Sequence, residues 1–317
     1  MSARPLPAEP TPFGWLLNQP YLLLSLTSLF WAGNAIVGRA AAGHIPPFTL
    51  SFIRWTLATL ILLPFGWRAL RQDWPLIRAR LGFMVFLSVI SIGLFNSLQY
   101  WGLEYTTALN SLLLQSSGPL FVAIWSLLVL RIRLTMAQAG GIAASMLGVL
   151  VILLQGNLAA LSAIQLNKGD LLFLLAMAIF GLYAVLTQKR PAIQQLSFLT
   201  FTFACGALCL VPAFLWEWLT RPPLEFNVAT GLSLAYVAVF PSVLAYTFYN
   251  RGIALIGANR SAPFFHLIPV FGSAMAIFFL GETLHLFHIV GYALVLTGIV
   301  VAARKPKPLA VAEAPTS

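Results

Sequence analysis

The chain has 317 residues, of which 60% are hydrophobic and 8% are charged, and its formal net charge is +10. Soluble domains usually carry about 25% charged residues, so this composition excludes an ordinary soluble protein. The basic residues lie in short links between apolar runs, which explains the positive charge without a nucleic-acid-binding surface.

Apolar runs of about 20 residues recur along the chain, and each is long enough to cross the hydrocarbon core of a bilayer as a helix. They predict an all-α integral membrane protein with ten transmembrane helices. In chain order, the predicted spans are 20–40, 48–67, 81–103, 107–130, 136–155, 170–188, 196–219, 229–251, 258–280 and 286–303. The polar segments 1–19 and 304–317 are predicted to be cytoplasmic tails, the first of them disordered.

The distribution of lysine and arginine predicts the orientation, because cytoplasmic loops carry an excess of both. With a cytoplasmic N-terminus, the inside segments hold 14 of the 18 basic residues: Arg4, Arg68, Arg71, Arg78, Arg80, Arg131, Arg133, Lys189, Arg190, Arg251, Arg260, Arg304, Lys305 and Lys307. The outside segments hold only Arg39, Lys168 and Arg221, and Arg54 lies within a span. We therefore predict that both termini are cytoplasmic.

Sliding the chain along itself by 150 residues aligns its two halves without a gap. Gly102 then falls on Gly252, and Gly148 falls on Gly298. The alignment predicts two five-helix repeats, 20–155 and 170–303, and the odd number of spans inverts the second repeat in the membrane. Inverted repeats are the usual architecture of transporters, because they provide two related states that open to opposite sides.

Several motifs resemble those of the drug/metabolite transporter superfamily, specifically its ten-helix EamA-type members. They are Phe-Trp-Ala-Gly-Asn at 30–34, Phe-Ile-Arg-Trp at 52–55, Gly-Leu-Glu-Tyr-Thr-Thr-Ala at 102–108, Leu-Ala-Tyr at 244–246, Gly-Ala-Asn-Arg-Ser-Ala at 257–262 and Leu-Gly-Glu at 280–282, with Pro119, Pro269, Gly291 and Gly298. The resemblance covers residues 20–303 and implies a bacterial inner-membrane transporter. A likeness of general pattern to bacterial exporters of aromatic amino acids implies the direction of transport.

The sequence departs from the family at the end of the fourth span, where members often have a glutamate. Here that position is Ile132, between Arg131 and Arg133. A role for such a glutamate therefore carries over only to Glu282 of the ninth span.

Two sets of polar side chains share one helical face each, at spacing i, i+3 and i+4. The sets are Asn96, Gln99 and Tyr100 in the third span, and Tyr246, Tyr249 and Asn250 in the eighth. The 150-residue offset maps each set onto the other, so we predict that they converge between the repeats and bind the substrate. The same prediction includes Asn34, Gln115, Tyr183 and His266. Hydrogen bonding that only holds the helices together is the open alternative.

Pro119 and Pro269 occupy equivalent positions, about 11 residues into the fourth and ninth spans. Proline removes a helical hydrogen bond, so we predict that each is a hinge, with a static kink as the alternative. Arg54 lies about six residues into the second span. We expect a structural role, in which it snorkels outward or pairs with Glu104 at the same membrane face, and contact with the substrate is the alternative.

No acidic residue lies near the middle of a predicted span, and the sequence holds neither paired carboxylates nor a nucleotide-binding glycine loop. It therefore predicts no catalytic residue, no metal and no cofactor. A solute transporter fits better than a membrane-embedded enzyme acting on lipid-linked substrates, or a channel.

A neutral site rich in aromatic residues suits amphipathic solutes, such as amino acids including aromatic ones, or drugs and other metabolites. The expected partners are the small-molecule substrate and membrane lipid, the expected state is a monomer, and no nucleic acid is expected.

Overall fold

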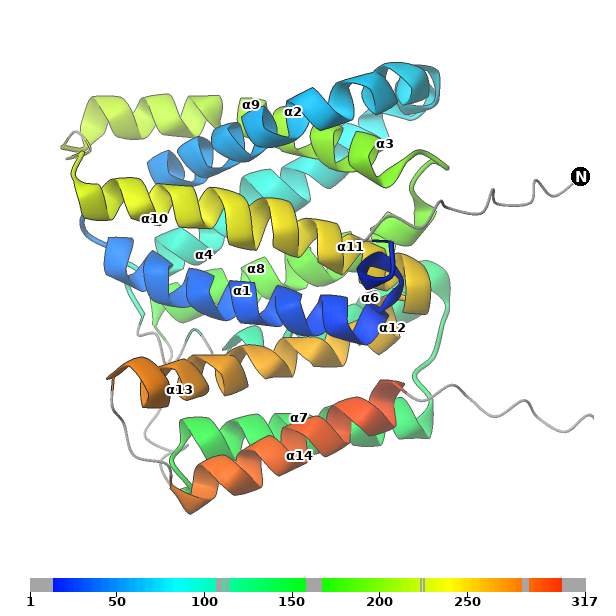
Figure 1. The fold of residues 1–317 in the computed structure, drawn as a ribbon, viewed down its shortest axis with the longest axis vertical. Coiled ribbons are helices and arrows are strands. Elements are labelled where there is room, and N and C mark those ends of the chain that lie inside the picture. Colours follow the sequence, from blue (N-terminus) through cyan, green and yellow to red (C-terminus); the bar gives the residue numbers. More distant parts are fainter. Residues whose placement is uncertain are drawn as a thin grey trace, which may run out of the picture.

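The computed structural model describes residues 14–106, 111, 114–157, 167–222, 224, 226–280 and 285–303. Within these residues every regular element is helical, and the helices lie side by side with their long axes roughly aligned (Figure 1). Residues 1–13 and 304–317 of the predicted tails, and Glu282, lie outside the described residues.

The described helices divide between the two repeats. The first repeat contains α1 (Pro20–Ala41), α2 (Pro47–Ala79), α3 (Leu81–Ser88), α4 (Asn96–Gly102), α6 (Gly118–Leu130) and α7 (Met136–Leu153). The second contains α8 (Lys168–Leu186), α9 (Gln195–Thr220), α10 (Val228–Ala238), α11 (Ala245–Ile256), α12 (Ala258–Ser261), α13 (Leu267–Leu280) and α14 (Leu286–Ala303). Eight helical stretches of the described chain are long and apolar enough to cross a membrane, and α6 and the interrupted segment α12–α13 complete the ten spans.

Helix α2 is longer than the predicted second span. It runs for 33 residues, and the segment from Trp67 to Arg80, which was expected to be a link, continues the helix to Ala79. At 1.5 Å per residue the helix is about 50 Å long, so its last turns extend beyond the hydrocarbon core. Hydropathy detects only the apolar part of such a helix, because turns outside the membrane can be polar.

The third and eighth spans are each interrupted by a π-helical turn. The turns cover Val89–Phe95 and Val239–Leu244, so they begin 150 residues apart. A π-helical turn shifts the backbone hydrogen bonding locally and frequently marks a functional site. The repeat thus preserves a backbone irregularity that the spacing of apolar residues does not predict.

The two predicted hinge prolines lie at the start of helical segments and not in mid-helix. Pro119 is the second residue of α6 and follows a turn at residues 116–117. Pro269 is the third residue of α13 and follows a 3-10 turn, Ala262–His266. The first turn of a helix leaves its N–H groups without intrahelical acceptors, so proline is tolerated there. Both spans are therefore broken just before the proline.

Helices α7 and α14 pack together at one edge of the bundle (Figure 1). Gly141 faces Gly298 and Gly148 faces Gly291, so the two helices run antiparallel, as inversion of the repeat requires. A Cβ atom on Gly141 would lie 2.5 Å from the carbonyl oxygen of Gly298. Only glycine allows the backbones to come this close, which is a common basis of helix packing in membranes.

Candidate functional site

Arg54 lies at the centre of a polar network that joins the two repeats, and its side chain is 0% exposed. Its Nη1 donates to Tyr100 Oη at 2.6 Å and to Asn34 Oδ1 at 3.1 Å. On the second repeat, its Nε donates to Ser242 Oγ at 2.6 Å and its Nη2 donates to the carbonyl oxygen of Pro241 at 3.1 Å. The guanidinium therefore connects α1, α2, α4 and the π-helical turn before α11.

The expected alternatives for Arg54, outward snorkelling or pairing with Glu104, are wrong. Glu104 instead pairs with Arg221, whose Nη1 lies 2.5 Å from Glu104 Oε1. Arg54 is the eighth residue of α2, about 10 Å along the axis from the helix start, so its side chain reaches the interior. Arg221 directly follows α9 and comes to the same end of the bundle as Glu104.

Four predicted site residues surround a small hollow beside Arg54. Asn34, Gln99, Tyr100 and Gln115 line it together with Ala35, Leu103 and Phe173, and its volume is about 10 Å³. Such a volume is about that of one water probe. In the described part of the chain, the amide groups of Gln99 and Gln115 have no hydrogen-bond partner, and both face this hollow.

The other members of the two polar faces meet where the repeats contact each other. Asn96 Nδ2 donates to Tyr246 Oη at 3.2 Å, and both groups also donate to the carbonyl oxygen of Ser91 at 3.2 Å. Tyr183 Oη donates to Asn250 Oδ1 at 3.0 Å. These contacts hold helices together, so the structure brings the two faces into one region without making all six residues line one hollow.

A cluster of aromatic rings adjoins these polar contacts. The centroid of the Trp31 ring lies 5.2 Å from the ring centroids of Tyr249 and Phe265, and 5.6 Å from that of Phe180. Tyr249 is buried, and its hydroxyl has no hydrogen-bond partner among the described residues. Ring pairs at these separations stabilise the core, and a buried phenol without a partner among the described residues calls for an explanation.

His266 is satisfied by protein groups at both ring nitrogens. Its Nδ1 lies 2.5 Å from Ser145 Oγ, and its Nε2 lies 2.9 Å from the carbonyl oxygen of Ser116. It is completely buried and does not line the hollow. The structure therefore places His266 in the contact between the 3-10 turn, α7 and the break before α6.

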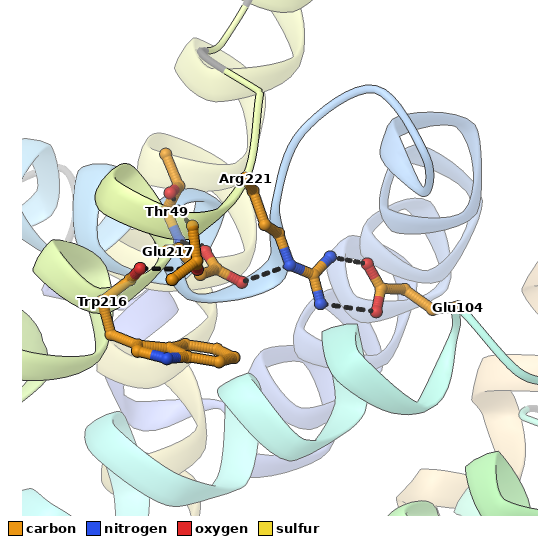
Figure 2. Close-up of polar contacts among 6 residues, drawn as sticks. Thr49, Glu104, Trp216, Glu217 and Arg221 are labelled. Atoms are coloured by element: carbon orange, nitrogen blue, oxygen red, sulfur yellow. Dashed lines mark hydrogen bonds and ion pairs between the residues drawn. The ribbon is translucent and has the colours of Figure 1, made fainter.

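Glu104, Glu217 and Arg221 form a cluster of charged residues beside the start of α2 and the end of α9 (Figure 2). Glu217 Oε2 accepts hydrogen bonds from the backbone N of Thr49 at 2.7 Å and from its Oγ1 at 3.0 Å, at the start of α2. Arg221 Nε lies 3.9 Å from Glu217 Oε1, and the hydrogen bond to Glu104 raises the pKa of Arg221 above its ordinary value. A hollow of about 250 Å³ borders the Glu104–Arg221 pair. The cluster links the first repeat to the second.

The EamA-like transporter family matches this chain twice, at residues 18–154 and at residues 167–304. The chain belongs to the EamA-like transporter family. As an EamA-like protein it is a multi-pass membrane transporter rather than an enzyme.

Several proteins are similar to this EamA-like chain over most of their length. The uncharacterized transporter YyaM of Bacillus subtilis is 29% identical over 89% of this chain and 93% of that protein. A probable amino-acid metabolite efflux pump of Salmonella typhimurium is 28% identical over 87% of this chain and 92% of that protein. One solved crystal structure has the same fold, with a TM-score of 0.68 at 18% identity over 90% of this chain and 97% of that chain.

The sequence did not indicate the groups of the second repeat that hold Arg54, namely Ser242 Oγ and the carbonyl oxygen of Pro241. Two signals were present. A charged residue inside an apolar span is a functional-site candidate in its own right, which applies to Arg54. A proline within a span frees the carbonyl four residues earlier, and Ser242 Oγ donates to that oxygen, on Val237, at 2.6 Å.

Proposed function

We propose that this EamA-like transporter exports amino acids, aromatic ones among them, by alternating access at a site between its two repeats. The observation that carries the proposal is that two amides and a buried phenol, all without a hydrogen-bond partner among the described residues, lie with a cluster of aromatic rings on helices that contact each other across the two repeats. An aromatic amino acid needs both polar partners for its backbone groups and ring faces for its side chain.

The names of two relatives support the substrate class and the direction. Besides the Salmonella protein, a probable terminal-alkyne amino-acid exporter of Streptantibioticus cattleyicolor is 24% identical over 91% of this chain and 95% of that protein. Both names describe movement of amino-acid compounds out of the cell. Their similarity to this chain extends over both repeats, where the proposed site lies.

The proposed substrate contacts are the lining of the small hollow and the aromatic residues beside it. The polar residues of this set are Asn34, Gln99, Tyr100, Gln115 and Tyr249. The hydrogen-bonded pairs Asn96–Tyr246 and Tyr183–Asn250 are buried between the helices that carry these residues and stabilise their positions. A hollow of about 10 Å³ is too small for an amino acid, so substrate entry requires the repeats to separate.

We propose that the protein lies in the bacterial inner membrane with both termini cytoplasmic, and the positive-inside distribution of its basic residues supports this orientation. The cluster around Arg221 then closes the outer end. Cysteine labelling from outside intact cells tests this orientation, since Lys168 and Trp74 are both exposed and lie at opposite ends. Lys168→Cys should react and Trp74→Cys should not, and the reverse pattern would invert the topology.

Counterflow in proteoliposomes tests the substrate class. Vesicles loaded with unlabelled amino acids should accumulate labelled phenylalanine transiently, without added nucleotide. Vesicles that contain Gln99→Ala should do so several-fold more slowly, because a lost hydrogen bond weakens binding by about 0.5–1.5 kcal/mol. If no amino acid exchanges while a drug or another metabolite does, the amino-acid assignment fails.

A further inference from the structure

We propose that Arg54 binds the carboxylate of the transported solute, so that this transporter selects compounds with a free carboxylate. The proposal rests on the function proposed above and specifies how its site recognises substrate. It starts from the position of Arg54, which is completely buried and contacts two residues that line the hollow, Asn34 and Tyr100.

The positive charge of Arg54 has no counter-ion among the described residues. All four of its hydrogen-bond partners are neutral: a hydroxyl, a phenol, an amide oxygen and a backbone carbonyl. Burial of a charge is costly unless an opposite charge is close, so this site favours an anion.

Every acidic residue in the described part of the chain is engaged elsewhere, near a helix end. Glu104 pairs with Arg221, and Glu217 binds the start of α2 at Thr49. Asp170 caps the start of α8, and Asp73 accepts from the backbone N of Gln194. None of these carboxylates contacts Arg54, so the substrate is the source of negative charge that the site lacks.

The donors of Arg54 also allow for an incoming acceptor. A guanidinium has five N–H groups, and the contacts to Ser242, Asn34, Tyr100 and Pro241 use four of them. The remaining donor is on Nη2. When the repeats separate, a carboxylate that displaces Asn34 or Tyr100 can bind the guanidinium with two hydrogen bonds, the geometry that arginine favours.

The remaining surroundings fit an apolar or aromatic solute body. The guanidinium lies over the ring of Trp55 at 4.7 Å, and the cluster of Trp31, Phe180 and Tyr249 lies in the same core. No described carboxylate is present here to bind an ammonium group. Ion pairing therefore selects for the carboxylate alone, whereas the neutral amides of the hollow can accept hydrogen bonds from an ammonium group, and an α-keto acid should also bind.

Thermal unfolding of the purified full-length protein with three ligands tests this selection. Phenylalanine and phenylpyruvate carry the carboxylate, whereas phenylalaninamide has the same ring and no carboxylate. The two acids should raise the melting temperature in a concentration-dependent manner, because a ligand that binds only the folded state stabilises it. The amide should produce little shift, and equal stabilisation by the amide would overturn the proposal without any mutant.

Substitution of Arg54 tests its role directly. Arg54→Gln should weaken binding of both acids by roughly tenfold to hundredfold and abolish the preference for acid over amide, while Arg54→Lys should retain part of that preference. Arg39→Gln is the matched control, because Arg39 is an exposed arginine of the same repeat that binds the backbone oxygen of Leu103. It should leave the preference unchanged.

The outcomes separate this inference from the proposed function. If phenylalanine exchanges in proteoliposomes but Arg54→Gln keeps the full preference for acids, the role of Arg54 is refuted and amino-acid export stands. If phenylpyruvate stabilises the protein through Arg54 but no amino acid exchanges, Arg54 binds carboxylates and the amino-acid assignment fails.

Discussion

Asn96 and Tyr246 occupy equivalent positions in the two repeats, 150 residues apart, and their side chains are hydrogen-bonded to each other at 3.2 Å. His266 and the carbonyl oxygen of Ser116 form a second contact with the same separation in sequence. When two repeats exchange conformations, a contact between equivalent residues maps onto itself. These contacts therefore lie near the pseudo-twofold axis and can persist in both states of the transporter.

Replacing Tyr246 by phenylalanine should destabilise the protein. The hydroxyl of Tyr246 contacts Asn96 Nδ2 and the carbonyl oxygen of Ser91, and both contacts are buried. Tyr246→Phe removes them and should lower the free energy of unfolding by about 1–2 kcal/mol, measurable by chemical denaturation or as a lower melting temperature. An unchanged stability would mean that this axial contact does not hold the repeats together.

Tyr249→Phe is the matched substitution one helical turn later, and it should not destabilise the protein. The buried hydroxyl of Tyr249 has no hydrogen-bond partner among the described residues, so its removal leaves nothing unpaired there. Counterflow of labelled phenylalanine should nevertheless slow several-fold, because the hydroxyl is proposed to bind substrate. A variant with full transport activity would show that this phenol is not a substrate contact.

The sequence predicted the ten spans and the inverted repeat because both depend on patterns that are local or periodic. Apolar length determines whether a segment crosses the membrane, and the 150-residue offset follows from residue identities alone. The same offset also identified Asn96 and Tyr246 as equivalent positions, although not as direct partners. Gln99 and Gln115 were predicted site residues, and both line the hollow.

The remaining features depend on three-dimensional contacts that no local pattern encodes. Arg54 and Glu104 were assigned to the same membrane face, but the chain after α9 supplies Arg221 as the partner of Glu104. Pro119 and Pro269 predicted a hinge or a kink but not the complete break before each proline, because apolar composition is the same for a continuous and a broken helix. The π-helical turns are invisible to hydropathy for the same reason.

The ion pair between Glu104 and Arg221 should favour closure of its end of the bundle. The pair is partly exposed, and such pairs contribute about 0–1 kcal/mol, so Glu104→Gln should hardly change global stability. Loss of about 1 kcal/mol from the closed state can nevertheless raise the population of the state open at this end by up to about fivefold. Labelling of Ala35→Cys, which lines the hollow, should therefore be faster from outside in the Glu104→Gln background.

The control for this prediction lies at the opposite end of the bundle. Asp73 accepts a hydrogen bond from the backbone N of Gln194 at 2.8 Å, so it also links the two repeats. Asp73→Asn should not accelerate labelling from outside. Equal acceleration by both substitutions would indicate general loosening of the bundle, and no acceleration by Glu104→Gln would refute the role of the ion pair.

Pro119→Ala and Pro269→Ala should slow exchange more than they weaken substrate binding. Each proline begins an α-helical segment after a break, and it cannot donate a backbone hydrogen bond to the residue four positions earlier, Gln115 or Phe265. Alanine restores that donor, so the segments before and after each break can join into one stiffer helix. We expect several-fold slower counterflow. The binding constant should stay within about twofold of the original, because that factor corresponds to a change in binding free energy of about 0.4 kcal/mol or less.

Pro64→Ala is the control, since Pro64 is exposed inside the continuous helix α2, and it should leave the rate unchanged. If neither Pro119→Ala nor Pro269→Ala alters the rate, the breaks are static and the repeats move about other positions.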